Sequence, residues 1–273
     1  MILKDYMIRN NCIFCNGDDR LSKEHFWPDW LQAHIGKDPS YKYVQGAESG
    51  NVAELESPDV VDKRERSGHV TTKKFRVVCT SCNNGWMSEL EKKAKTILEP
   101  LFLGKHLALN QEEQKLISVW CFMKIMVADG EPEEGRVFLP SEMHAFYRDR
   151  TIPSNFRIYL GRHSTDSKTA YFKSSFKLRI KDIEIQPIEG ANRNSLSVTF
   201  TFGPMVFCVL GCKVGNYPIW QHVKLSHMKP IYPICKTVIN TKALKLIAES
   251  NLRDIVCGLE MFIEEKAQKG LTE

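Results

Sequence analysis

The chain has 273 residues, a formal net charge of +5, and hydrophobic and charged fractions of 42% and 26%. These values are typical of a folded globular protein and argue against intrinsic disorder. The most apolar run, residues 116–127, is too short to cross a bilayer and contains Lys124, and residues 1–10 lack the apolar core of a signal peptide. We therefore expect a cytoplasmic protein with no membrane partner. The mild positive charge permits a polyanionic partner without requiring one.

The cysteines give the first indication of a site. Nine cysteines in a chain expected in the reducing cytosol indicate metal binding or catalysis before disulfides. Zinc takes four soft ligands, and two Cys-x-x-Cys pairs supply them, so the pairs predict one structural zinc site formed by Cys12, Cys15, Cys79 and Cys82. Unpaired thiols are the alternative. The remaining cysteines lie in apolar stretches and are expected to be small buried side chains: Cys121, Cys208, Cys212, Cys235 and Cys257.

Short elements are expected in the first hundred residues. Pro28 suits a first helical turn, and it opens a predicted short helix over residues 28–35. Residues 36–68 have weak periodicity and many turn formers, which predict an inserted loop region. Residues 75–78 predict a strand that runs into the second cysteine pair. A helix with one apolar face is predicted over residues 86–98.

A larger part of the chain follows residue 104. Residues 111–127 predict a helix that is apolar nearly all round and therefore buried. Thr241 is expected to begin a long terminal helix. Four strands are predicted between these helices, the last two joined by a hairpin turn: residues 156–159, 169–180, 196–202 and 205–213. The predicted fold class is α+β, with a small zinc-stapled domain over residues 1–104 and a larger mixed domain over residues 105–273.

An ordered motif accompanies the two cysteine pairs. The segment Glu24-His25-Phe26-Trp27-Pro28 follows the first pair, and Asn83 follows the second pair directly. An acidic residue beside histidine, then x-x-Pro, then a cysteine pair ending in Cys-Asn at a helix start resembles the HNH (ββα-metal, or His-Me finger) endonucleases. The resemblance covers residues 11–99, and the Cys-Asn ending is similar to phage junction resolvases of the endonuclease VII type.

The resemblance implies a role for each motif residue. His25 is the general base that activates water, and Glu24 and Asn83 bind a catalytic Mg²⁺ or Mn²⁺ ion, with Asn84 as a second candidate ligand. Because side chains alternate along a strand, Glu24 and His25 are expected to point to opposite sides. The implied function is metal-dependent hydrolysis of phosphodiester bonds in DNA, with the ion stabilising the leaving oxyanion, in a context of phage defence or mobile DNA.

One position departs from the family pattern. Many HNH enzymes carry an asparagine five residues before the last cysteine pair, where it orients the catalytic histidine, and this chain has Lys74 there. Either another group orients His25, such as a backbone carbonyl or Asn51, or the protein is weak or inactive. The alternative function is therefore a zinc-stabilised module that binds nucleic acid or protein. A redox role is disfavoured because the pairs do not lie in a thioredoxin-like βαβ pattern.

DNA is the expected partner, and the part after residue 104 is expected to serve target recognition, dimerisation or regulation, which makes it a candidate surface for homo-oligomer formation. Basic residues cluster around the motif, although solvated faces interleaved with glutamates explain them equally: Lys63, Arg64, Arg66, Lys73, Lys74, Arg76, Lys92, Lys93 and Lys95. Zinc is expected to supply folding free energy on the order of several kcal/mol, so Cys79→Ser would unfold residues 11–99 alone.

Overall fold

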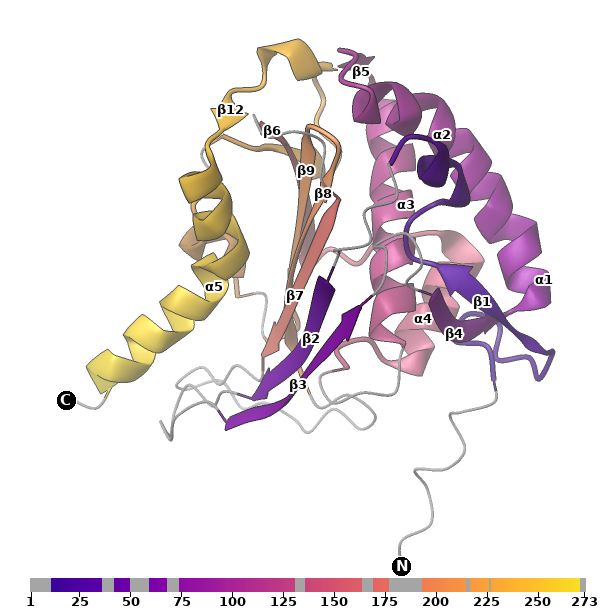
Figure 1. Ribbon diagram of the computed structural model, residues 1–273, viewed down its shortest axis with the longest axis horizontal. Helices are drawn as coiled ribbons and strands as arrows, with labels where there is room; N and C mark the ends of the chain where they lie inside the picture. The colour runs from indigo at the N-terminus through magenta and orange to yellow at the C-terminus, as the bar shows by residue number, and fades with distance from the viewer. Residues whose placement is uncertain are drawn as a thin grey trace, which may run out of the picture.

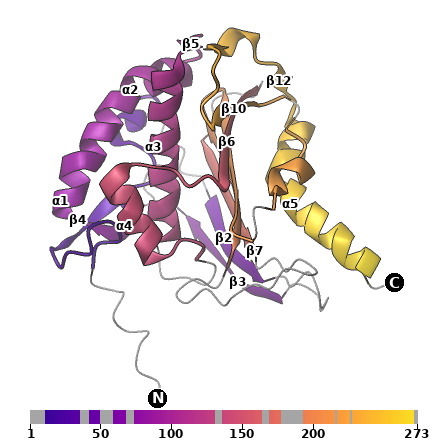
Figure 2. The ribbon, with the colours of Figure 1, turned by 180° about the vertical axis from the view of Figure 1, so that it is seen from behind.

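The chain folds around a central β-sheet with helices on both faces (Figures 1 and 2). The helices are α1 (Thr80–Cys82), α2 (Ser88–Phe102), α3 (Gln111–Asp129), α4 (Pro140–Asp149) and α5 (Glu249–Gly270). The computed structural model describes residues 11–35, 42–49, 59–67, 74–130, 136–163, 169–176, 193–214, 217–225 and 227–270. The predicted mixed α+β class is confirmed. Among these residues no helix has the length and apolar character that a membrane span requires.

The central sheet has the order β10-β6-β9-β8-β7, and β12 pairs with β6. All its pairings are antiparallel except the parallel pairing of β12 with β6. Its strands are β6 (Phe156–His163), β7 (Ala170–Phe176), β8 (Ser195–Phe202), β9 (Met205–Cys212), β10 (Lys229–Tyr232) and β12 (Leu246–Ile247). A short pairing of β5 (Ala108–Leu109) with β11 (Ile239–Asn240) lies outside this sheet.

The hairpin predicted between the third and fourth strands of the second part is confirmed. β8 and β9 pair antiparallel, with Phe202 opposite Met205 across the turn. Gly203 has φ +58° there, and a Cβ atom at this position would lie 2.5 Å from the carbonyl oxygen of Phe102. Glycine is therefore required by both the backbone conformation and the close approach of α2.

Side chains of the sheet alternate between two hydrophobic cores. In β9, Phe207 and Val209 belong to the larger core beneath α2, α3 and α4, whereas Cys208 and Leu210 belong to a smaller core on the opposite face. Ile255 of α5 packs in that smaller core. The strand is therefore buried on both faces, which explains why its sequence is continuously apolar rather than alternating.

Helix α3 is the predicted buried helix at the centre of the larger core. Asn110 and Glu113 form a capping box at its start, which satisfies backbone N–H groups that have no partner inside a helix. Side chains on every face of this helix are buried, as predicted. One of the buried residues of α3 is a lysine, Lys124, which is 1% exposed.

The N-terminal cysteine region contains a strand pair followed by a helix. β1 (Leu21–His25) pairs antiparallel with β4 (Lys74–Cys79), and His25 lies opposite Lys74. After β4 the chain enters α1, a π-helical turn over Asn83–Met87, and α2. The short helix predicted after Pro28 is a 3-10 helix.

Two predicted elements need correction, and a third is described only in part. The region predicted as an inserted loop contains an antiparallel pair, β2 (Lys42–Ser49) and β3 (Asp59–Ser67), and the rest of it lies outside the described residues. The terminal helix begins at Glu249 rather than Thr241, because Thr241–Ala243 forms a 3-10 turn and β12 then joins the sheet. The end of the second predicted strand lies outside the described residues, and β7 itself covers Ala170–Phe176.

Aromatic side chains join the two predicted domains. Trp27, which is fully buried, lies 6.0 Å from Phe200 and 5.9 Å from Phe202 between ring centroids. The ring centroids of Phe26 and Tyr171 are 4.5 Å apart. One hydrophobic core therefore contains residues from both sides of position 104. The division into two domains at that position stays a prediction.

Candidate metal centre and histidine site

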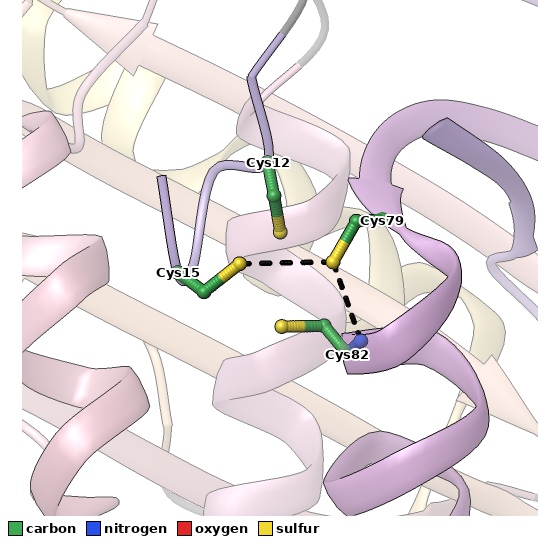
Figure 3. A group of neighbouring side chains, drawn as sticks. All are labelled: Cys12, Cys15, Cys79 and Cys82. Carbon is green, nitrogen blue, oxygen red and sulfur yellow. Dashed lines mark hydrogen bonds between the residues drawn. The ribbon is translucent and has the colours of Figure 1, made fainter. Parts of the chain in front are cut away.

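The two cysteine pairs converge on one point (Figure 3). One ligand atom from each of Cys12, Cys15, Cys79 and Cys82 lies within 4.8 Å of the others, and the sulfurs of Cys15 and Cys79 are 3.6 Å apart. A tetrahedral zinc ion with Zn–S bonds of about 2.3 Å separates its sulfurs by about 3.8 Å. The four cysteines could therefore hold a structural metal such as zinc, as the sequence predicted.

The backbone around the cysteines supports thiolates. The N–H of Gly17 donates to the sulfur of Cys15 at 3.4 Å, and the N–H of Cys82 donates to the sulfur of Cys79 at 3.3 Å. Burial raises the pKa of the Cys79 and Cys82 thiols. Because burial disfavours the charged form, a bound cation is what would keep these groups ionised at neutral pH.

β1 and β4 pair as antiparallel strands beside the cysteine cluster, and His25 lies at the end of β1. Nδ1 of His25 is 2.9 Å from Oδ1 of Asp29, the residue four positions later at the start of the 3-10 helix. A carboxylate that accepts the Nδ1 proton selects the tautomer in which Nε2 carries the lone pair. The Asp29 side chain is 71% exposed, so this contact contributes orientation rather than stability.

The sequence left open which group would contact His25, because Lys74 occupies the position of the family's asparagine. Lys74 lies across the strand pair from His25, and its side chain is exposed. Asp29 contacts the His25 ring instead, whereas Asn51 lies outside the described residues. His25 and Asp29 are four residues apart, a spacing that brings two side chains together on an α-helix. Because Pro28 lies between them, the sequence predicted no helix across both residues and therefore no contact between them.

The outer face of the strand pair is basic around His25. Lys23 is two residues from His25 on β1, and Lys74 and Arg76 are two residues apart on β4. All three basic residues are exposed, whereas Glu24 and Phe75 between them are buried. Strand alternation places Lys23 and Lys74 on the side that carries the imidazole. Arg76 lies where the pairing is irregular and is exposed as well.

Glu24 points to the other side of the strand and ends in a buried ion pair. Its Oε1 lies 2.6 Å from Nζ of Lys124 in α3. The same ammonium group lies 3.0 Å from Oε2 of Glu91 in α2 and donates to the carbonyl oxygen of His25 at 2.9 Å. Burial alone would lower the pKa of Lys124, but the charges of Glu24 and Glu91 raise it above its usual value. The ammonium therefore stays charged at neutral pH and uses all three of its donors.

Asn83 lies at the end of the second cysteine pair and contacts β1. Its Nδ2 donates to Oγ of Ser22 at 2.9 Å, and Ser22 in turn donates to the carbonyl oxygen of Val78. These bonds fix the amide and leave Oδ1 as its acceptor atom. The contacts found among the described residues include none between Glu24 and Asn83. Asn84, the second candidate, is exposed.

The structure therefore unites the four cysteines, pairs His25 with Asp29, and joins Glu24 to Lys124. Sequence reasoning missed Asp29 and Lys124. Lys124 interrupts a long apolar run, and a lysine in such a run is a signal for a buried charge that needs acidic partners. The comparisons add no relative: no family model, no curated protein and no solved structure matches the chain.

Proposed function

We propose that this protein is an endonuclease of the HNH type that hydrolyses phosphodiester bonds in DNA. The observation that carries the proposal is the His25–Asp29 pair on the basic face of a strand pair beside the cysteine cluster. Phosphodiester hydrolysis requires a base for water and positive charge for the phosphate. Both requirements are met by side chains on this one face.

In the proposed reaction, the Nε2 lone pair of His25 takes the proton of the attacking water. Asp29 holds the imidazole in the required tautomer through Nδ1. Lys23, Lys74 and Arg76 neutralise phosphate oxygens and so attract the backbone of DNA. Each of these roles uses a side chain on the exposed side of the strand pair.

A divalent ion is part of the proposal. Oε2 of Glu24 and Oδ1 of Asn83 are hard oxygen donors, the class that Mg²⁺ and Mn²⁺ prefer, and they would hold the ion together with water. When bound, such an ion supplies charge stabilisation for the leaving oxygen. Because Lys124 already binds Oε1 of Glu24, only the second carboxylate oxygen is offered to the metal.

The same lysine favours a second candidate function. An ammonium group between Glu24 and Glu91 already neutralises the carboxylate that the motif assigns to the metal. A protein with this arrangement would bind DNA through its basic face without cutting it. We therefore retain a zinc-stapled DNA-binding module as the alternative, and cleavage separates the two.

The test is cleavage of a supercoiled plasmid by purified protein whose zinc content has been measured. Magnesium is omitted and then restored, because a chelator would also threaten the cysteine-bound metal. We expect nicking only with Mg²⁺ or Mn²⁺, and a loss of about 10²–10⁴-fold in His25→Ala because general-base catalysis contributes that much. His227→Ala, a partly exposed histidine in a loop before β10, is the matched control and should cut like the wild type. Equal cutting by His25→Ala would remove the assignment.

A second prediction concerns Asp29. Asp29→Asn should lower kcat about 10- to 100-fold with little change in KM, because the carboxylate orients the base and does not bind substrate. Asp29→Glu should restore part of the rate, and Asp18→Asn, an exposed acid nearby in the sequence, should have no effect. Unchanged kcat in Asp29→Asn would show that another group orients His25.

A further inference from the structure

A pocket of about 500 Å³ opens beside the cysteine cluster. One wall belongs to the segment that carries the second cysteine pair, and the other belongs to the end of α4, from the later part of the chain. The residues that matter are Ser81, Cys82 and Trp86 on the first wall and Tyr147, Arg148 and Arg150 on the second. Both ribbon views place α4 beside α1 and β4 (Figures 1 and 2).

Arg150 is held in place before any ligand arrives. Its guanidinium carbon lies 3.7 Å from the centroid of a Trp86 ring and 5.2 Å from that of Tyr147. Its Nη1 donates to the carbonyl oxygen of Phe146 at 3.2 Å, and its backbone has φ +53° at the end of α4. A guanidinium stacked on an aromatic face loses little further freedom on binding and keeps N–H donors at its edge for an anion.

Two arginines line the pocket beside Cys15 and Cys82 of the cysteine cluster. Arg148 is exposed next to Arg150, and no aspartate or glutamate lines the pocket. Within the part of the chain that the structure describes, neither arginine has a carboxylate within ion-pair distance. Two arginines without carboxylate partners, beside aromatic rings in a shared concavity, favour an anion, and arginine matches the geometry of phosphate oxygens best. The Cys82 thiol also interacts electrostatically with Arg150.

We propose that this pocket binds a backbone phosphate of DNA that flanks the bond His25 would cleave, at the Cys79 end of the strand pair. The inference rests on the proposed function and extends it, because it assigns to α4 a direct part in substrate binding. Cys82 lines the pocket and Asn83 follows it in the chain. The pocket opens at the Cys79 end of the strand pair, whereas His25 pairs with Lys74 at the other end, four residues along β1 or about 13 Å away. A duplex that reaches the basic face of β1 and β4 carries further phosphates on either side of that face.

Another role for the two arginines makes a different prediction. Four thiolates around one divalent ion carry net negative charge, and the arginines could serve only to neutralise it. In that case their replacement would lower metal retention and thermal stability and leave DNA binding by the folded fraction unchanged. A phosphate-binding role instead predicts weaker DNA binding at full zinc content and unchanged melting.

The experiment measures binding of a short fluorescent DNA duplex by anisotropy in magnesium-free buffer, with zinc content and melting recorded for each protein. Arg148→Glu should weaken binding about tenfold and reduce the slope of log K against log salt by about 1–2, because a phosphate contact becomes a repulsion. Arg150→Lys should weaken binding severalfold, since lysine keeps the charge but loses the stacked planar fork. Arg253→Glu is the control: α5 lies on the opposite face of the sheet, so its affinity change should be small.

The outcomes separate this inference from the proposed function. Unchanged affinity and salt slope in Arg148→Glu, or losses equal to those of Arg253→Glu, would overturn the inference while leaving plasmid cleavage by the wild type intact. If Arg148→Glu and Arg150→Lys weaken DNA binding but the wild type never cuts DNA, the inference is supported and the nuclease is rejected. Reduced zinc with unchanged affinity in the folded fraction would assign the arginines to the metal centre and also overturn it.

Discussion

Cys79→Ser is expected to abolish the metal centre and unfold the larger core as one unit. Cys79 is fully buried, and its loss leaves three of the four converging ligands. A structural zinc site contributes on the order of 10 kcal/mol to folding, which equals the whole net stability of an ordinary domain. Because the core around the cysteines continues into α3 and the central sheet, loss of the metal should destabilise both parts together.

This expectation differs from what the sequence alone suggested, which was unfolding of residues 11–99 only. The measurement is thermal unfolding followed by far-ultraviolet circular dichroism, with zinc determined by elemental analysis. Cys235→Ser is the matched control, because Cys235 lies apart from the cluster and is partly exposed, and its stability change should stay within about 0.5 kcal/mol. A folded remainder with its own separate transition in Cys79→Ser would show that the two parts fold independently.

Lys124→Met is expected to lower the free energy of unfolding by about 3–5 kcal/mol, the usual cost of removing one partner from a buried ion pair. The lysine stem is well replaced by methionine, so the loss is electrostatic. Glu24 would keep a buried carboxylate without its counter-ion, and the carbonyl oxygen of His25 would lose a donor. Glu91 is partly exposed and can recover solvation, so most of the penalty falls on Glu24.

A double-variant cycle tests this assignment. Adding Glu24→Gln to Lys124→Met should recover part of the loss, because the unpaired charge is removed, and the two changes should be clearly non-additive. Lys93→Met, on the exposed side of α2, should change stability by no more than about 0.5 kcal/mol. If Lys124→Met lowers the free energy of unfolding no more than Lys93→Met does, and if its effect is additive with that of Glu24→Gln, the ion pair is not energetically important.

Lys124 also explains how the two parts of the chain build one site. It reaches from α3 to Glu24 and to the backbone of His25 on β1, and to Glu91 on α2. The strand that carries the imidazole is therefore anchored by a helix from beyond position 104. The backbone of His25 is thus joined to α3 by a buried hydrogen bond.

Local patterns in the sequence determined a large part of this protein. The two cysteine pairs predicted one converging metal centre, because zinc chemistry requires four such ligands wherever they lie in the chain. The long, nearly continuous apolar run of α3 and the strand–turn–strand pattern of β8 and β9 predicted those elements, since each pattern arises from burial on every side or from contacts between near neighbours.

Tertiary structure alone decided the surroundings of the motif residues. Periodicity carries no information on which distant side chain will meet Glu24, and Lys124 lies 100 residues away from it in the chain. The partner of His25 depended on how the turn at Pro28 directs the 3-10 helix. The shared core and the arginine pocket likewise arise from the packing of α4 and the sheet against the cysteine region, which are contacts between segments far apart in sequence.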